Sequence, residues 1–339
     1  MFSFSTKKVS VVVSISTNHI SYVIVDKDSD GFFVVHYEEA VLPEGIIEKG
    51  EILKAEALTN ILKKIRSTIS EHVPSKRKVE YSLLLPHHYF RYEAIPLTLS
   101  PEEKNRKEYV QQFLKDNSDT YPWVTNHSYT FHYSQEAQEL YISALNNDMY
   151  SSYRSVFQTA GYVDVNIESS TTACGILLND QPLASLVLFG EDFSYLIGYR
   201  NGHRVSSQKF EISYQRFVSD IVRGLRIEPS VARKIISDYG VSRAHKDSKV
   251  YTQLMRSLTP LLDLLRKKKI VSKHPLHVWY LNTPIIAMEE VIEKRVGIEV
   301  KELHPLNIPT HNFHEVLTMH KDESYRYSLL LAYAMVNTQ

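Results

Sequence analysis

The sequence predicts an α/β fold with two lobes and a small module inserted into the first of them. Three strand patterns joined by polar turns open the chain within residues 9–37. A similar set returns within residues 185–212, where Asn201-Gly202 has the composition of a tight hairpin turn. Helical patterns follow each set. Because strands followed by helices occur twice, we expect two related lobes.

The first lobe continues after its opening strands. Apolar residues recur at helical spacing between 54 and 71, which predicts an amphipathic helix that covers one face of a sheet. A strand pattern follows at 79–85, and another at 162–167 returns to the lobe after the inserted module. We therefore assign residues 1–85 and 161–182 to the first lobe.

The inserted module has a different order of predicted strands and helices. Strands of alternating polarity are predicted at 129–133 and 139–145, with helices before and after them. Ser100 can cap the first of these helices, and Glu103 can complete a capping box three residues later. We therefore expect residues 86–160 to form an α+β module of their own.

The second lobe is predicted from residues 183–212 and 270–339. A strand at 277–281 begins its later part, and an apolar helix at about 325–335 closes the chain. Helical patterns fill the segment between the two parts. We expect residues 213–269 to form a helical subdomain.

Composition limits the compartment and the chemistry. Lysine plus arginine (39) equals aspartate plus glutamate (39), so no overall charge attracts nucleic acid or an acidic membrane. The single cysteine, Cys174, excludes an internal disulfide framework and a cysteine-based zinc site. No apolar stretch approaches the roughly 20 residues that span a bilayer. We expect a cytoplasmic protein that does not insert into the membrane or bind nucleic acid.

Several short motifs carry a family resemblance. They are Leu42-Pro43-Glu44-Gly45 with Gly50-Glu51-Ile52, Tyr81-Ser82-Leu83-Leu84-Leu85-Pro86 with Ile95-Pro96-Leu97, Ala160-Gly161-Tyr162 with Ile167-Glu168, and His304-Pro305. In this order they resemble the type IV pilus assembly protein PilM family of the actin-like ATPase superfamily. The resemblance implies a two-lobed actin-like (RNase H-like) fold, with an inserted α+β subdomain of the FtsA and PilM type in the first lobe.

The resemblance also implies a function through binding. PilM-like proteins are scaffolds of the pilus assembly platform and bind the N-terminal cytoplasmic peptide of the inner-membrane protein PilN, in a groove between the first lobe and the insertion. They associate peripherally with the inner membrane through such partners, and pilus motor ATPases and a second copy of the chain are further candidate partners. The aromatic-rich insertion supplies the candidate groove residues Leu97, Tyr109, Phe113, Tyr129 and Phe131.

Nucleotide binding is the chemistry to test in this fold. Actin-like ATPases hold magnesium and phosphate with a carboxylate and a glycine in each of two hairpin loops. The first loop here, Ser14 to Asn18, has neither. The second retains Gly190 and the downstream Ser194 but has no carboxylate in register.

We therefore expect a degenerate nucleotide site without catalytic residues, hydrolysis or a required cofactor. ATP with magnesium is the ligand to test there. The residues that remain for residual binding are Ser14, Ser16, Thr17, Asn18, Gly190, Ser194, Asn282 and Thr283.

Other interpretations stay open. Diverged phosphate loops could still serve an active ATPase or small-molecule kinase, and type II secretion GspL-like or polymerising FtsA-like proteins share the fold.

Histidines cluster in two regions, and His311-x-x-His314 has a spacing that metal ligands use, but loop histidines explain the pattern better and we predict no metal site. Cys174 lies in an apolar helical pattern, which is typical of a buried, inert thiol.

Overall fold

The computed structural model describes residues 8–27, 31–73, 77–98, 106–178, 180–191, 193–267, 274–281, 284–304 and 321–337. These residues form two compact units. The first contains the described residues up to Ile176 together with those from Leu329 onward, and the second contains the described residues between Leu177 and Ser328. None of the described helices is both long enough and apolar enough to span a bilayer.

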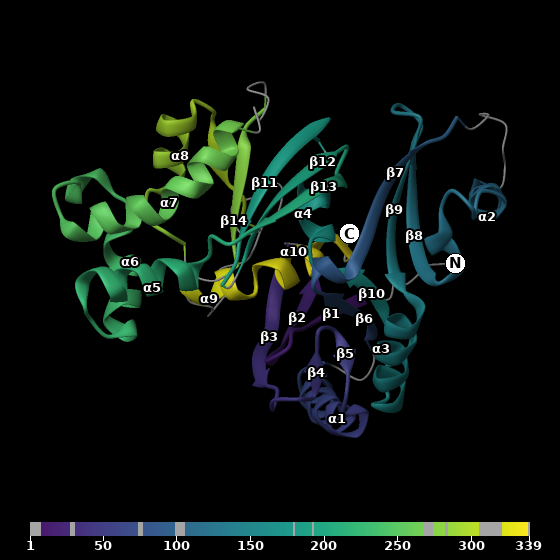
Figure 1. Cartoon of the computed structure of the whole chain (residues 1–339). Coiled ribbons are helices and arrows are strands. Elements are labelled where there is room, and N and C mark those ends of the chain that lie inside the picture. Colours follow the sequence, from purple (N-terminus) through teal and green to yellow (C-terminus); the bar gives the residue numbers. More distant parts are fainter. Residues whose placement is uncertain are drawn as a thin grey trace. The chain divides into compact units, whose positions relative to one another are not determined.

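The first unit is built on a five-stranded sheet (Figure 1). Its strands are β1 (Lys8–Ile15), β2 (His19–Lys27), β3 (Phe32–Val41), β6 (Lys78–Leu85) and β10 (Asn166–Ser169). They lie in the order β10-β6-β1-β2-β3, in which β1, β2 and β3 form an antiparallel meander and β6 and β10 are added in parallel. The predicted opening meander is confirmed.

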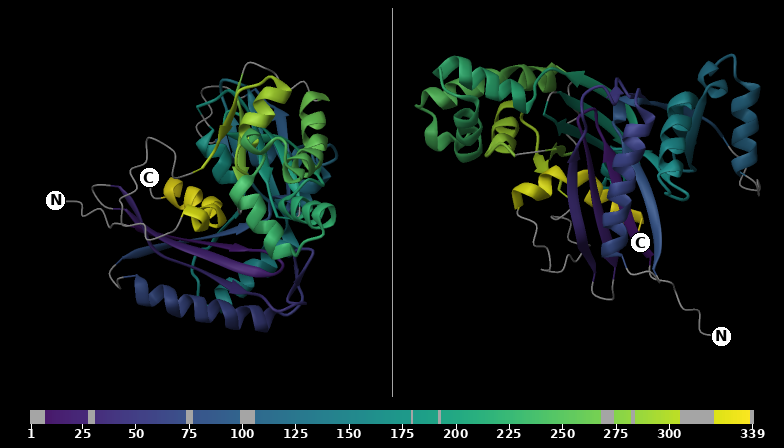
Figure 2. Two further views of the ribbon diagram at one scale, coloured as in Figure 1. Left: turned by 90° about the vertical axis from the view of Figure 1, so that its left-hand side faces the viewer. Right: turned by 90° about the horizontal axis from the view of Figure 1, so that it is seen from below.

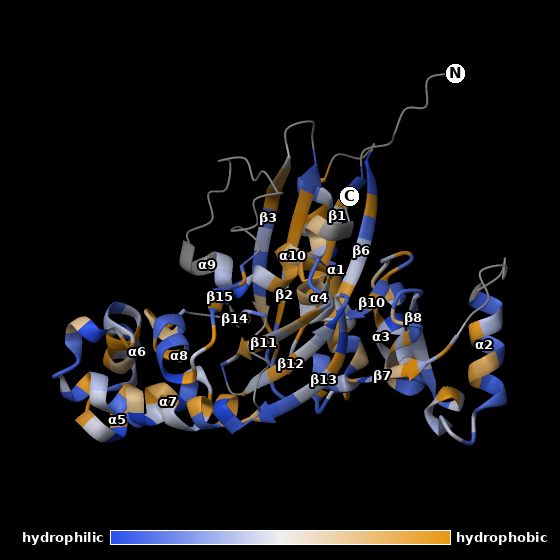
Figure 3. Cartoon of the chain, turned by 90° about the horizontal axis from the view of Figure 1, so that it is seen from above, coloured by the Kyte–Doolittle hydropathy of each residue, from blue (hydrophilic) through white to orange (hydrophobic). Residues whose placement is uncertain are grey.

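Helices lie on both faces of this sheet. They are α1 (Ala55–His72), α3 (Asn147–Thr159), the short α4 (Thr172–Leu177) and α10 (Ser328–Asn337). As the spacing predicted, α1 buries its apolar stripe, and this stripe packs in one core cluster with residues of α3. Figure 2 shows α1 and α10 on opposite faces of the sheet. The described part of α10 is hydrophobic on all sides (Figure 3), as expected of a fully buried helix.

The inserted module is a small α+β body within the first unit. Its elements are η1 (His87–Tyr89), β7 (Phe90–Pro96), α2 (Arg106–Asp116), η2 (Pro122–Thr125), β8 (His127–Ser134) and β9 (Glu139–Asn146). The strands form an antiparallel sheet in the order β7-β9-β8. Val110 and Leu114 of α2 pack with Trp123 and with Ile142 of β9 in a separate core. The predicted cap at Ser100 lies outside the described residues.

The second unit repeats the sheet of the first. Its strands are β11 (Leu183–Phe189), β12 (Ser194–Arg200), β13 (His203–Phe210), β14 (Leu276–Tyr280) and β15 (Val300–Glu302). The order is β13-β12-β11-β14-β15, again with an antiparallel meander and two parallel additions. Asn201 and Gly202 both have positive φ in the β12–β13 turn, as the Asn-Gly pair predicted. The repeated pairing pattern confirms the two related lobes.

Helices complete the second unit. They are α5 (Tyr214–Leu225), α6 (Pro229–Tyr239), η3 (Arg243–His245), α7 (Lys249–Lys267), α8 (Met288–Val296) and α9 (Lys321–Arg326). Their apolar faces share one core with β11 and β14. The two very short strands β4 (Ile47–Glu48) and β5 (Glu51–Ile52) belong to the first unit.

The end of the chain differs from the sequence expectation. A single helix was predicted at 325–335, but the structure has a turn at Tyr327 between α9 and α10. Residues 270–339 were assigned to the second lobe, whereas the residues from Leu329 onward group with the first unit. The chain therefore returns to its first unit after completing the second.

Candidate functional site

The turn between β1 and β2 is the first candidate phosphate loop. Its centre is Ser16, whose Oγ accepts the backbone N–H groups of Asn18 (3.3 Å) and His19 (3.1 Å). The same hydroxyl donates to the His19 carbonyl oxygen (3.1 Å). A phosphate cradle needs backbone N–H groups that point at the ligand. These two N–H groups point instead at a side chain of their own turn.

The rest of this turn is also held by the protein. The Asn18 carbonyl oxygen accepts the N–H of Leu42 (2.7 Å). Burial raises the pKa of the Tyr89 phenol, and a side-chain hydrogen bond with Thr17 partly opposes the rise. The first loop is thus a hairpin turn in which the Ser16 hydroxyl, the Thr17 side chain and the Asn18 carbonyl oxygen have partners within the protein.

We expect Ser16→Ala to destabilise the first unit by about 1 kcal/mol, because two backbone N–H groups lose their acceptor. Urea denaturation of the full chain measures the loss. Ser16→Asp is the matched control, since its carboxylate can accept the same N–H groups and should retain most of the stability. Equal stability of Ser16→Ala and the unchanged chain would show that the turn does not depend on this hydroxyl.

The turn between β11 and β12 is the second candidate phosphate loop. A Cβ atom on Gly190 would lie 2.4 Å from the carbonyl oxygen of Phe193, so only glycine fits this close backbone approach. The Gly190 N–H donates to Oγ of Ser194 (3.4 Å), whose side chain is fully buried. Gly190 therefore allows the two sides of its own turn to approach and to form a hydrogen bond.

Helix α5 fixes the same turn from its N-terminus. The N–H groups of Tyr214 and Gln215 donate to the carbonyl oxygens of Gly190 (3.0 Å) and Glu191 (2.9 Å). The Glu191 carboxylate accepts from the Gln215 side chain (2.6 Å) and pairs with Arg233 (3.3 Å). The one described carboxylate in this turn is thus engaged with α5 and α6.

The predicted nucleotide residues are placed as follows. The first unit holds Ser14 at the end of β1 and Ser16, Thr17 and Asn18 in the turn, while the second unit holds Gly190 and Ser194. Asn282 and Thr283 lie outside the described residues. Ser16 bonds within the first turn, and Gly190, Glu191 and Ser194 bond within the second turn or to the adjoining helices.

Glu168 is a carboxylate that the sequence did not single out as a site residue. It lies on β10 and pairs in register with Leu84 of β6, which pairs in register with Ser14 of β1. Because adjacent strands lie about 4.8 Å apart, Glu168 is about 10 Å from Ser14 on the same row of the sheet. The carboxylate thus lies two strands away from the end of β1, in the same row of the sheet, while the first loop itself has none.

The environment of Glu168 changes its chemistry. Burial raises its pKa to about 7, while hydrogen bonds with the side chains of Thr172 and Asn166 partly oppose this rise. Asn166 also donates to the phenol oxygen of Tyr333 in α10 (2.9 Å). A carboxyl group that titrates near neutral pH can give or accept a proton under physiological conditions. Glu168 differs from an ordinary strand glutamate only in its reduced contact with water. A single sequence does not reveal this reduction.

A metal site needs a set of ligands close together. Among the residues that the structure describes, no three histidine, cysteine, aspartate or glutamate side chains gather as a metal site requires. The histidine pair at 311 and 314 lies outside the described ranges. Cys174 is buried in α4.

The predicted partner residues divide into core and surface. Leu97 is buried in the core of the inserted module, and Phe113, Tyr129 and Phe131 are half-buried against that core. Tyr109 of α2 is 41% exposed. The structure therefore leaves Tyr109 as the residue of this set that can offer a large apolar area to a partner.

Known proteins resemble this chain in structure but not in sequence. No protein-family model matches the chain, and no curated protein sequence is similar to it. Solved structures do match. The PilM–PilN type IV pilus biogenesis complex contains a chain that is 14% identical, with a TM-score of 0.65, over 97% of this chain and 98% of that one. This chain has an actin-like fold.

Two other solved structures share this actin-like fold. The ethanolamine utilization protein EutJ from Carboxydothermus hydrogenoformans is 11% identical, with a TM-score of 0.52, over 96% of this chain and 89% of that one. MreB5 of Spiroplasma citri bound to ADP is 12% identical, with a TM-score of 0.52, over 97% and 95%. Because these identities are low, the similarity establishes the actin-like fold and leaves activity and partners to be tested.

Proposed function

We propose that this protein is a cytoplasmic scaffold of a type IV pilus or related assembly platform. It binds the N-terminal cytoplasmic peptide of a PilN-like inner-membrane protein and thereby associates with the membrane. The observation that carries the proposal is the likeness to a chain of the PilM–PilN complex over 97% of this chain and 98% of that one. This match extends through the inserted module, which is the part that we assign to partner binding.

A binding role rather than ATP turnover is supported by the two candidate phosphate loops. In the first, Ser16 accepts the N–H groups of Asn18 and His19. In the second, Gly190 lies close to the Phe193 carbonyl oxygen, and the Gly190 carbonyl oxygen accepts the N–H of Tyr214 in α5. Holding a magnesium-nucleotide complex would require both turns to exchange these bonds for bonds to phosphate.

The inserted module offers two means of holding a peptide. Within the described part of the chain, β7 and β8 each pair only with β9, so each has an outer edge to which an extended peptide can add as a further strand. Tyr109 on α2 adds exposed aromatic area, and tyrosine contributes strongly to interfaces because it loses little conformational entropy.

Two titrations of the purified full chain test the proposal. A synthetic peptide covering the N-terminal cytoplasmic segment of the PilN-like protein from the same organism should bind, and ATP with magnesium should give neither binding heat nor phosphate release. A peptide that does not bind would overturn the partner assignment. Turnover of ATP would overturn the scaffold assignment.

The alternative is an actin-like ATPase with diverged loops, and Glu168 is the observation that favours it. A half-buried carboxyl group with a pKa of about 7 can accept a proton from an attacking water molecule. If the chain releases phosphate, Glu168→Gln should abolish the release without unfolding the protein. If turnover is present but indifferent to this substitution, the carboxyl group has no part in it.

We expect Tyr109→Ala to weaken binding of the PilN-like peptide about tenfold, because truncation removes an aromatic contact from the interface. Calorimetric titration measures the effect. Tyr239→Ala is the matched control, since Tyr239 is 42% exposed and belongs to the second unit. Both variants should have the thermal stability of the unchanged chain. Equal weakening by the two substitutions would remove the inserted module from the proposed interface.

A further inference from the structure

A groove in the second unit lies outside both candidate phosphate loops and the inserted module. It is a cavity of about 690 Å³ bounded by the end of β13 and by α5 and α7. This volume is within the range of roughly 300–1,000 Å³ that is typical of ligand-binding pockets. All of its lining residues belong to the second unit, so it is formed by one compact body.

The walls of the groove are continuous faces of two helices. Residues 253, 256, 257, 260 and 264 of α7 line it at spacings of three and four, and residues 216, 220, 223 and 224 of α5 line it in the same way. At 1.5 Å per residue, the lining face of α7 extends for about 16 Å. The site is therefore an elongated groove.

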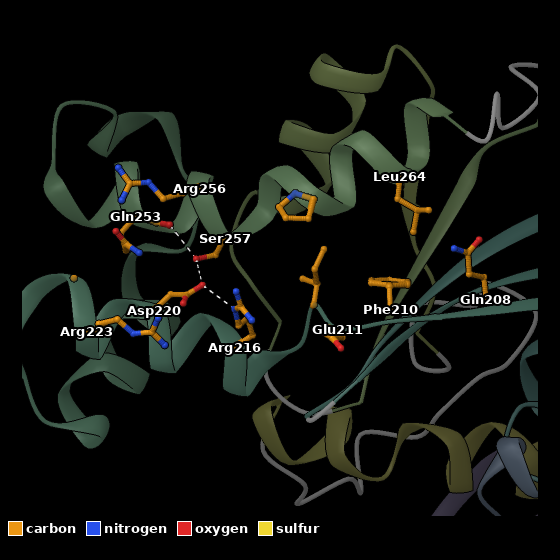
Figure 4. A pocket seen from close by; sticks show the side chains of 13 residues that line it. Gln208, Phe210, Glu211, Arg216, Asp220, Arg223, Gln253, Arg256, Ser257 and Leu264 are labelled. Atoms are coloured by element: carbon orange, nitrogen blue, oxygen red, sulfur yellow. Dashed lines mark hydrogen bonds and ion pairs between the residues drawn. The ribbon is translucent and has the colours of Figure 1, made fainter.

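The two ends of the groove differ in polarity (Figure 4). Arg223, Arg256 and Gln253 lie together at one end, and Phe210 and Leu264 lie toward the other, where Gln208 is a polar neighbour. Gly224 allows this approach of α5 and α7, because a Cβ atom there would lie 2.9 Å from the side-chain amide carbon of Gln253.

Positive charge is in excess among the residues that line the groove, where three arginines (Arg216, Arg223 and Arg256) stand against two carboxylates (Asp220 and Glu211). Asp220 is held between Nε of Arg216 (3.3 Å) and Oγ of Ser257 (2.7 Å), so its carboxylate is already paired. The side chains of Arg223 and Arg256 are exposed and make no ion pair or hydrogen bond with the described part of the chain. Two guanidinium groups are therefore available to an anionic ligand, to which they can donate in a forked geometry.

The apolar end contains a proline within a helix. Pro260 lies inside α7, and because proline has no N–H, the carbonyl oxygen of Arg256 lacks the donor that position 260 would otherwise supply. Phe210 and Leu264 are half-buried beside it. This end can accept a bulky apolar side chain, and the polar end adds both positive charge and a backbone acceptor.

We infer that this groove binds a short acidic segment of a partner protein, in which a carboxylate contacts Arg223 and Arg256 and a bulky apolar side chain lies against Phe210, Pro260 and Leu264. An extended chain rises about 3.3 Å per residue, so the two side chains are two to four positions apart. A small anion would occupy one end of the groove only. The site does not depend on the function proposed for the first unit.

The test selects ligands from random 12-residue peptides displayed on phage, using the full chain as bait. We expect enrichment of peptides with aspartate or glutamate two to four positions from phenylalanine, leucine or tryptophan. Fluorescence anisotropy of a labelled selected peptide then measures affinity. Arg223→Ser and Arg256→Ser should each weaken it about tenfold, which corresponds to about 1.4 kcal/mol, and Leu264→Asn should weaken it at the apolar end.

Arg243→Ser is the matched control, because Arg243 is an exposed arginine of the same unit outside the groove. This variant should bind the peptide as the unchanged chain does. Phenylacetate and phenyl phosphate serve as small-anion probes and should not displace the peptide at millimolar concentration. Selected peptides without the acidic and apolar pair, equal weakening by Arg243→Ser, or tight binding of a small anion alone would each overturn the proposal.

Discussion

Gly190→Ala is expected to destabilise the second unit by about 3 kcal/mol, whether or not a nucleotide is present. The added Cβ atom would lie 2.4 Å from the Phe193 carbonyl oxygen, a backbone atom that cannot rotate away as a flexible side chain can. The turn would have to open, and the N–H bonds that α5 donates to it would lengthen. A loss of this size lowers the melting temperature by roughly 10 °C.

The chain's two tryptophans allow each unit to be followed separately. Trp123 is buried in the first unit and Trp279 in the second. In a Trp123→Phe background, the fluorescence of Trp279 reports unfolding of the second unit. Gly297→Ala is the control, since its Cβ atom would meet nothing within 4 Å although its φ is +80°. It should cost about 1 kcal/mol from backbone strain alone.

The comparison of these glycines also bears on function. If Gly190 serves a phosphate group, ATP with magnesium should stabilise the unchanged chain and Gly190→Ala should lose that stabilisation. If it serves the turn, as the contact with Phe193 indicates, the loss of stability should be the same with and without ATP. A Gly190→Ala chain as stable as the Gly297→Ala chain would contradict the steric argument.

The fold could be predicted from the sequence because its strongest signals are local. Alternating strands, the Asn201-Gly202 turn and the spacing of the α1 apolar residues each depend on neighbours within a few positions. The assignment of α10 failed because a helix that is hydrophobic on all sides carries no information about which sheet will cover it. The position of α10 at the end of the sequence suggested the second lobe, whereas in the structure α10 packs in the first unit.

The candidate site was less predictable because its properties are tertiary. The sequence retains Gly190, but only the structure shows the carbonyl oxygen of Phe193 beside it. The missing carboxylate of the first loop could be read directly from Ser14 to Asn18, whereas the burial of Glu168 depends on its strand and the helices around it. A local pattern thus indicates which groups a loop lacks, but not which groups neighbouring strands supply.

The dependence of stability on pH is the second large effect that we expect, and Glu168 and His277 contribute to it with opposite signs. Burial also raises the pKa of Glu289 and lowers the pKa of His36 and of His132, so these groups add slopes of the same two signs. Burial raises the pKa of Glu168 from 4.5 to about 7. The native state therefore binds this proton more tightly, and the stability associated with it, present below pH 4.5, is lost as pH rises to 7. The loss is at most about 3 kcal/mol.

His277 acts in the other direction. Burial first, and then the nearby charge of Lys301, lower its pKa from 6.5 to about 4, against smaller opposing effects of Asp180 and Glu299. The native state disfavours the charged imidazole, so this contribution is full above pH 6.5 and is lost as pH falls to 4. Its size is again about 3 kcal/mol. In the unchanged chain, the two contributions offset each other wherever the units unfold together.

Single substitutions should expose each contribution. In Glu168→Gln the contribution of His277 is no longer offset by Glu168, so relative to the double variant the free energy of unfolding should rise by about 3 kcal/mol between pH 4 and 6.5. In His277→Gln the contribution of Glu168 is no longer offset by His277, so relative to the double variant the free energy of unfolding should fall by a similar amount between pH 4.5 and 7. Urea denaturation at half-unit pH steps measures both slopes. The double variant, which keeps Glu289, His36 and His132, is the reference against which each slope is measured. Parallel profiles in the two single variants would contradict the assignment of opposite signs to these groups.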